Sequence, residues 1–319
     1  MKKQLVKSAV RLLTPLLVFS ATALGQTLYQ DNFDTDTSAS WTVNDPGETD
    51  ITVVFSYDYS AIGVPAAPGG SGTTGLKMTA NNTGGVFSGF SVSPTGESFS
   101  GNYRVSFDLW QNYVGPVGPG GSGTTQFSMF GIGTSGTTPI KIGNTTESLG
   151  FGATLDGGSS VDYRVYSSLF LTGYAEGDPV FQSGGGRNGS DPYYAVFGGE
   201  SAPVDQVSLF PGQTGVTDAG ELAFAWRSVT IEVLDGSATW SVDGTPIAVV
   251  DVSTVNLGGG NIFFGHDDTN AGVSTDPNKE LLNVTLIDNV KVEALAIPEP
   301  GTYALGIIGA LLLFGRRRK

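Results

Sequence analysis

Short runs of alternating hydrophobic and polar residues, separated by Gly, Asn, Asp and Pro, fill the chain between residues 26 and 295. A period of two is typical of β-strands with one buried face. In residues 103–113, for example, Val105, Phe107 and Leu109 share one face of the expected strand. No stretch of this interval has convincing helical periodicity. The pattern predicts an all-β fold, an antiparallel β-sandwich.

The same pattern gives the expected strands and loops. We expect strands at residues 28–33, 41–43, 51–57, 75–80, 85–92, 103–113, 126–132, 138–142, 161–170, 227–234, 238–242, 246–250, 261–264 and 281–293. Asp235-Gly236 and Asp243-Gly244 predict two tight hairpins, because Asp-Gly supplies the backbone conformations that such turns need. Residues 61–74 and 114–125 predict long loops, since Gly and Pro dominate them.

Composition narrows the classes of partner. Of the 16 Lys and Arg, eight lie at the two ends of the chain, which leaves eight between residues 26 and 315 against thirty Asp and Glu, a formal charge of −22. Nucleic acid is disfavoured, because binding phosphates requires basic patches. A polyanionic sugar is also disfavoured unless a cation bridges it. There is no Cys, so disulfides and thiolate chemistry are excluded.

The last residues form a distinct pattern. Pro298-Glu299-Pro300 precedes fifteen uncharged residues, Gly301 to Gly315, and the chain closes on Arg316, Arg317, Arg318 and Lys319. Fifteen helical residues span roughly 22 Å, short of a ~30 Å hydrocarbon core, and snorkelling cations can cover the difference. A buried helix would not normally carry four cations at its end. The pattern therefore predicts a C-terminal transmembrane helix.

This order of motifs resembles the PEP-CTERM sorting signal of Gram-negative bacteria. The resemblance covers residues 298–319 and implies an exosortase-type membrane protease as partner. It also implies export through an inner-membrane intermediate to the cell surface or the extracellular matrix. Pro298, Glu299 and Pro300, with Arg316, Arg317 and Arg318, are then the sorting and processing residues. We assign residues 296–319 to this signal.

The N-terminal residues agree with export. Lys2, Lys3, Lys7 and Arg11 precede an apolar run, residues 12–19, and Ala23-Leu24-Gly25 offers a cleavage site before Gln26. We therefore expect an N-terminal signal helix within a signal peptide, residues 1–25. The two addresses frame one β-sandwich domain, residues 26–295.

Three short stretches carry a second resemblance. Phe33-Asp34 with Trp41-Thr42-Val43, residues 238–245 (ATWSVDGT) and residues 287–292 (IDNVKV) resemble a concanavalin-like, laminin-G-like jelly roll. That resemblance implies that the first and last strands pair.

Glycoside hydrolases of the resembled fold carry Glu-x-Asp-x-(x)-Glu on one strand, and that full motif does not occur here. Glu48-Thr49-Asp50 and Glu176-Gly177-Asp178 match its first half, but no Glu follows either of them at the required spacing. Glu232 and Asp235, in the expected meander, are at an odd separation, which places them on opposite faces of a strand. His266, the single histidine, excludes multi-His metal sites, and no Gly-x-Ser-x-Gly elbow accompanies it. We interpret it as a solvated or hydrogen-bonded loop residue.

Asp267, Asp268 and Asn270 place three oxygen ligands within four residues, in what we expect to be a loop. They could hold Ca²⁺, with Asp288 and Asn289 nearby if the last strand pairs there. The alternative is a polar turn that satisfies its own backbone.

Two sets of aromatic residues remain. Trp41, Trp226 and Trp240 are expected in the core. Trp110, Tyr113, Tyr174, Tyr193 and Tyr194 lie near loops and could stack on sugar rings, although for each of them packing is the favoured reading.

The sequence thus predicts an exported, non-catalytic surface or matrix protein with a structural, adhesive or carbohydrate-binding role within exopolysaccharide. The alternative is a polysaccharide-active glycoside hydrolase or lyase whose acids come from separate strands.

Overall fold

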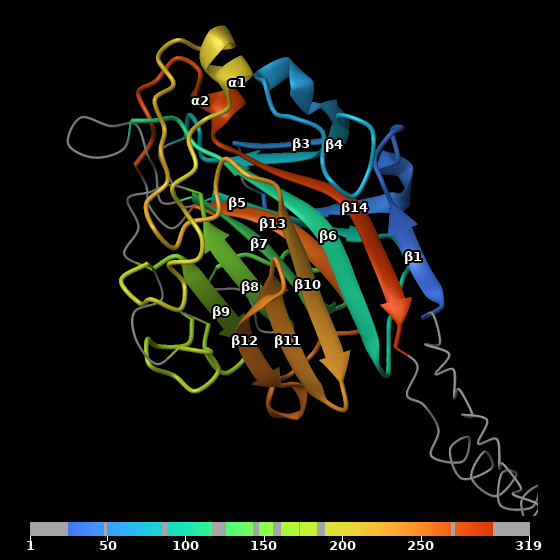
Figure 1. Ribbon diagram of the computed structural model, residues 1–319. Coiled ribbons are helices and arrows are strands. Elements are labelled where there is room, and N and C mark those ends of the chain that lie inside the picture. The colour runs from blue at the N-terminus through green and yellow to red at the C-terminus, as the bar shows by residue number, and fades with distance from the viewer. Residues whose placement is uncertain are drawn as a thin grey trace, which may run out of the picture. The chain divides into compact units, whose positions relative to one another are not determined.

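The computed structural model describes residues 25–47, 50–84, 88–116, 126–142, 147–155, 161–171, 173–183, 189–268 and 272–295 (Figure 1). Residues 26–295 form one compact unit. The expected signal helix and transmembrane helix lie outside the described residues, as do Asn270 and all six sorting residues. Within the described part of the chain, no helix has the length and apolar character needed to cross a membrane.

The strands form two antiparallel sheets. Sheet A has eight strands in the order β12-β11-β10-β6-β14-β4-β3, with β1 paired to β14. Its strands are β1 (Thr27–Asp31), β3 (Ile51–Asp58), β4 (Thr74–Ala80), β6 (Tyr103–Asn112), β10 (Arg227–Leu234), β11 (Ser237–Val242), β12 (Thr245–Asp251) and β14 (Val284–Ala294). Sheet B has six strands in the order β2-β5-β13-β7-β8-β9. They are β2 (Trp41–Asn44), β5 (Ser88–Pro94), β7 (Gln126–Thr134), β8 (Leu149–Thr154), β9 (Tyr163–Ser167) and β13 (Asn261–Asp268).

The described helices are short. They are α1 (Val204–Leu209), α2 (Lys279–Leu282), η1 (Ser38–Ser40), η2 (Tyr59–Ile62) and η3 (Val252–Thr254). The all-β prediction and the two-sheet antiparallel sandwich are confirmed. The pairing of the first and last strands is confirmed as well, because β1 runs antiparallel to β14 with Tyr29 opposite Val292.

The β10–β12 meander follows the expected hairpins. Asp235 and Gly236 have φ of 50° and 84°, and Asp243 and Gly244 have φ of 47° and 77°. Positive φ at both central residues matches the right-handed twist of the flanking strands. These turns confirm the boundaries predicted from the two Asp-Gly pairs.

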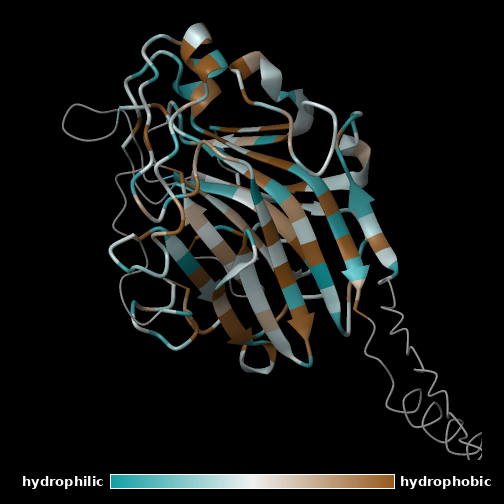
Figure 2. Ribbon diagram, in the orientation of Figure 1, coloured by the Kyte–Doolittle hydropathy of each residue, from teal (hydrophilic) through white to brown (hydrophobic). Residues whose placement is uncertain are grey.

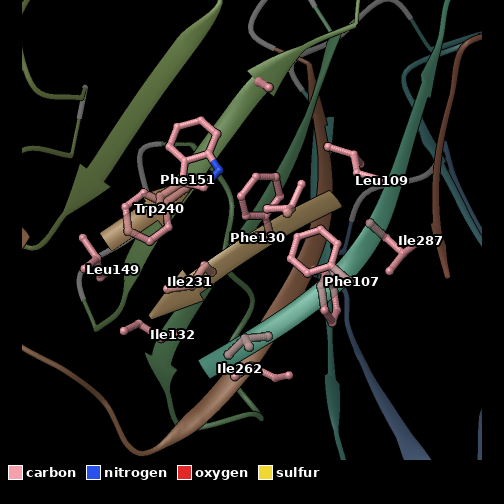
Figure 3. Close-up of a cluster of buried hydrophobic side chains, with 14 of the residues drawn as sticks. Phe107, Leu109, Phe130, Ile132, Leu149, Phe151, Ile231, Trp240, Ile262 and Ile287 are labelled. Atoms are coloured by element: carbon pink, nitrogen blue, oxygen red, sulfur yellow. The ribbon is translucent and has the colours of Figure 1, made fainter. Parts of the chain in front are cut away.

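The core lies between the two sheets. Hydrophobic and hydrophilic residues alternate along the front strands (Figure 2), and the hydrophobic ones face the other sheet. Phe107 of sheet A packs edge-on against Phe130 of sheet B, with ring centroids 5.1 Å apart (Figure 3). It packs in the same way against Phe264, also of sheet B, at 4.9 Å. Trp240 packs between Phe130 and Phe151, both at 5.5 Å. The core is therefore an interdigitated aromatic layer.

One predicted strand is wrong, and one observed strand was not predicted. Residues 138–142 form bends and irregular backbone, because the Ile140 N–H donates to the side chain of Ser91 in β5, 3.0 Å away, instead of to a backbone carbonyl of a neighbouring strand. Residues 149–154, for which no strand was expected, form β8. Its Gly150 and Gly152 resemble turn residues, but a Cβ at Gly152 would lie 2.9 Å from the Phe127 ring. Glycine is needed there because an aromatic ring fills the space that a side chain would occupy.

Candidate functional site

The face of sheet B that points away from sheet A is covered. Its side chains belong to a second buried cluster, which we call the outer cluster: Tyr113, Phe127, Met129, Ile140, Leu155, Tyr166, Ala202, Ala223, Phe224 and Phe263. Phe127, Met129, Tyr166 and Phe263 come from the strands, and the others come from connecting segments and the residue after β6. The described part of this face is thus buried beneath a hydrophobic layer that the connecting segments form.

His266 lies in β13, between the sheets, and is fully buried. The prediction of a loop position is wrong, and only its hydrogen-bonded character is confirmed. Gln126 Nε2 donates to the Ala80 carbonyl at 2.9 Å, which directs its Oε1 to His266 Nε2 at 3.1 Å. Because Oε1 only accepts, the imidazole proton sits on Nε2, and Nδ1 accepts from Thr285 Oγ1 at 2.9 Å. Burial lowers the pKa of His266 to about 3, so the ring is neutral.

The loop predicted for Asp267 and Asp268 is also wrong. Both residues continue β13, are buried, and point to opposite faces of the strand. Asp267 Oδ1 accepts from the Ile142 N–H at 3.1 Å, and Asp268 Oδ2 accepts from Asn81 Nδ2. The last strand does not pair here, because β14 belongs to sheet A. Among the described residues, no three His, Asp or Glu side chains are grouped to hold a metal ion.

Most of the aromatic candidates are core residues. Trp110, Tyr113, Tyr174 and Tyr194 are buried, which confirms packing over stacking on sugar for these four. Tyr193 is half-buried and donates its hydroxyl to the Pro246 carbonyl at 2.8 Å. Of the tryptophans expected in the core, Trp41 and Trp240 are buried, whereas Trp226 is half-buried and donates to the Pro65 carbonyl at 2.7 Å.

A pair of carboxylates that the sequence did not suggest lies on the outer face of sheet A. Asp108 of β6 is directly opposite Asp288 of β14. Burial raises the pKa of Asp288 to about 6, and the negative charges of Asp108 and Asp34 add to the shift. Glycoside hydrolysis uses two carboxyl groups of this kind, one with a raised pKa that donates a proton and one that stays ionised. No linear motif marks this pair, since its members are far apart in sequence.

The oxygens of this pair are engaged with the segment between β3 and β4. The Gly69 N–H donates to Asp108 Oδ2 at 2.9 Å, and Asn289 Nδ2 donates to the same oxygen at 2.8 Å. Tyr59 Oη lies 3.0 Å from Asp288 Oδ2. Asp108 is 7% exposed and Asp288 is 3% exposed. The pair therefore fastens a loop to the sheet.

Beside this pair, β14 changes its partner. It pairs with β4 over Thr285–Ile287 and with β1 over Val290–Glu293. Asn289, between the two stretches, has φ of 51° and interrupts the regular register. A cleft of about 620 Å³ opens at this point, which we call the junction cleft. Its lining includes Tyr29, Gln30, Asn32, Ser40, Asn289 and Lys291.

The strand order and the packing of the two sheets define the class of this protein as an all-β antiparallel sandwich. No family model and no curated protein matches the sequence. Several solved structures are similar. A Bacillus subtilis protein of unknown function with a galectin-like fold has 12% identity and a TM-score of 0.45, covering 85% of this chain and 97% of its own.

Two further structures are similar at the same level. An endo-1,3-beta-glucanase from Streptomyces sioyaensis has 11% identity and a TM-score of 0.44, covering 88% of this chain and 100% of its own. The Ca²⁺-bound exoplasmic/lumenal domain of VIP36 has 9% identity and a TM-score of 0.42, covering 84% and 90%. The fold class rests on this chain's own strand pairing, and the function has to be argued from its own residues.

Proposed function

We propose that this chain is an exported, non-catalytic protein of the bacterial surface or extracellular matrix. Its role is structural, adhesive or carbohydrate-binding within exopolysaccharide. The observation that carries the non-catalytic part is the state of Asp108 and Asp288. A general acid and a base need oxygens that reach the substrate. These two carboxylates are buried, and their oxygens accept hydrogen bonds from backbone and side-chain donors of the protein.

Turnover assays on residues 26–295, the compact unit, test this part. We expect the fragment to release neither reducing ends nor unsaturated products from a panel of neutral and acidic polysaccharides. Turnover that disappears in Asp108→Asn or Asp288→Asn would establish the rival function, a glycoside hydrolase or lyase. Glu232→Gln is the matched control, because Glu232 forms a surface ion pair with Arg104 at 2.5 Å, away from the pair.

The export part rests on the two terminal sequence patterns. A basic and apolar N-terminal stretch precedes the compact unit, and Pro-Glu-Pro, an apolar run and an Arg cluster follow it. We propose that an exosortase-type protease removes the C-terminal signal after the chain has passed through an inner-membrane intermediate. The apolar run holds the chain in the membrane until then.

Expression of the full chain in a Gram-negative host with an exosortase tests export. We expect the wild-type chain to lose its C-terminal segment and to reach the surface or the medium. Replacement of Pro298, Glu299 and Pro300 by Ala, or of Arg316, Arg317 and Arg318 by Gln, should leave an unprocessed chain in the membrane fraction. Lys279→Gln is the charge control. Equal processing of all variants, or retention of all chains in the cytoplasm, would contradict the proposed address.

A further inference from the structure

We propose that the junction cleft is a binding site for a neutral oligosaccharide. This inference rests on the proposed function, in its non-catalytic, carbohydrate-binding form, and names the site at which the carbohydrate binds. Three features carry it: the shape of the cleft, the neutral hydrogen-bonding groups that line it, and an aromatic ring at its edge.

The shape follows from the sheet. The β4 pairing of β14 ends at Ile287 and the β1 pairing begins at Val290, so the edge of β14 is uncovered between them. Gly69 covers one side through its N–H bond to Asp108, and β1 with the residues after it forms the other. The resulting volume, about 620 Å³, lies within the range of small-ligand sites. Strand pairing on both sides makes the cleft preformed.

The charged groups at the cleft are already compensated. Asp31 Oδ1 accepts from the Phe33 N–H and Asp31 Oδ2 accepts from Trp41 Nε1, both at 2.8 Å. Lys291 Nζ lies 2.6 Å from Glu293 Oε1. A charged ligand would have to break one of these contacts or remain unpaired, which costs free energy.

The groups that remain are amides and hydroxyls. Gln30 and Ser40 line the cleft with exposed side chains, and Asn32, also exposed, exchanges hydrogen bonds with Asp34. Amides and hydroxyls both donate and accept hydrogen bonds, and this dual character matches the hydroxyl groups of a sugar. The formal charge of −22 between residues 26 and 315 adds a long-range repulsion of polyanions. The lining therefore favours a neutral polyhydroxyl ligand over an acidic one.

Tyr29 supplies the aromatic surface. Its ring packs edge-on against Trp41 and Phe99, with centroids 6.1 and 6.4 Å apart. These contacts fix the ring, which is half-buried and lines the cleft. A fixed ring with an apolar body can contact the C–H face of a sugar without further ordering.

A titration of residues 26–295 with neutral gluco- and manno-oligosaccharides, and with uronic acid oligomers of equal length, tests the proposal. We expect calorimetry to detect the neutral ligands alone, and amide chemical shifts to change at residues 29–32, 69 and 289. Gln30→Ala should weaken binding about tenfold, the loss of one good hydrogen bond. Gln182→Ala, a change at another exposed glutamine, should leave binding unaltered.

Each other outcome overturns the proposal in a different way. If neutral oligosaccharides bind but the amide chemical shifts change elsewhere, or if Gln30→Ala binds them with equal affinity, the junction cleft is not the binding site, although a carbohydrate-binding function remains. Preference for uronic acid oligomers overturns the ligand class. If no oligosaccharide binds, both the proposed site and the carbohydrate-binding role are wrong. The structural or adhesive role then remains, and the export and turnover experiments test the rest of the proposed function separately.

Discussion

Asp108 and Asp288 face each other across β6 and β14, and each holds a different part of the segment between β3 and β4. Asp108 accepts from the Gly69 N–H at 2.9 Å, and Tyr59 Oη lies 3.0 Å from Asp288. Two like charges at directly opposite sheet positions destabilise each other. The β3–β4 segment and the lining of the junction cleft are therefore coupled to the ionisation of the Asp288 carboxyl group.

This coupling predicts a pH-dependent effect of Asp288→Asn. The pKa of Asp288 is about 6 in the folded protein, above its ordinary value of 3.8, so the folded state takes up the proton first. Asp288 thus costs stability above pH 6, and the cost disappears as pH falls towards 3.8. We expect Asp288→Asn to raise the free energy of unfolding on the order of 1–2 kcal/mol at pH 7, after allowance for solvent screening, and to have no effect near pH 3.5.

Urea denaturation of both chains between pH 2.5 and pH 7.5 measures this difference. Asp251→Asn is a control of opposite sign, because hydrogen bonds from Ser253 lower the pKa of Asp251. That variant should lose stability at neutral pH and recover as pH falls through the lowered pKa. A difference between wild type and Asp288→Asn that is constant across the pH range would contradict the inferred shift.

His266 predicts the opposite pH dependence. Its pKa is lowered from 6.5 to about 3, so the unfolded chain binds a proton that the folded protein excludes. The stability that it contributes is fully present above pH 6.5 and is lost as pH falls towards 3. This loss overlaps with the gain from Asp288, so the wild-type profile alone does not separate the two groups. The slope of stability with pH should decrease between pH 6.5 and pH 3 in a variant without His266.

His266→Phe supplies that variant and tests the hydrogen-bond chain. It preserves an aromatic ring but removes the two ring nitrogens that bond Gln126 Oε1 and Thr285 Oγ1. We expect a loss of about 2–4 kcal/mol in the free energy of unfolding at pH 7. Thr285→Val should cost less when His266 is already Phe, because the two residues share one interaction. Additive losses in the double variant would show that the two residues act independently.

Much of sheet A could be predicted from the sequence. The β10–β12 meander has regular alternation and Asp-Gly turns, so local preferences and the fold agree there. Sheet B was harder to predict, because both of its faces are covered and its strands lack alternation of apolar and polar residues. In β13, Phe263 and Phe264 are both buried, and the following His266 to Asp268 read as a polar loop although they extend the strand.

The candidate site was less predictable than the fold. The Asp108–Asp288 pair and the junction cleft join residues of β1, β6, β14 and the β3–β4 segment. Their proximity depends on register and on the positive φ of Asn289, and neither leaves a spacing pattern in the sequence. The two terminal patterns that we propose as export signals are local motifs, and for that reason the sequence alone suggests them.

The glycines of sheet B give a last prediction. A Cβ on Gly131 in β7 would collide with the Leu149 carbonyl oxygen and lie 2.6 Å from the Phe263 ring. Backbone cannot move away as a flexible side chain can, so Gly131→Ala should cost about 1–3 kcal/mol through overpacking. Gly212→Ala is the matched control, because no heavy atom lies within 4 Å of its added Cβ, and reduced freedom of the unfolded chain should leave its stability equal or slightly higher. Thermal and urea denaturation measure both changes. Equal stability of the two variants would mean that the Phe263 ring and β8 can shift, and that the outer cluster is not tightly packed against sheet B.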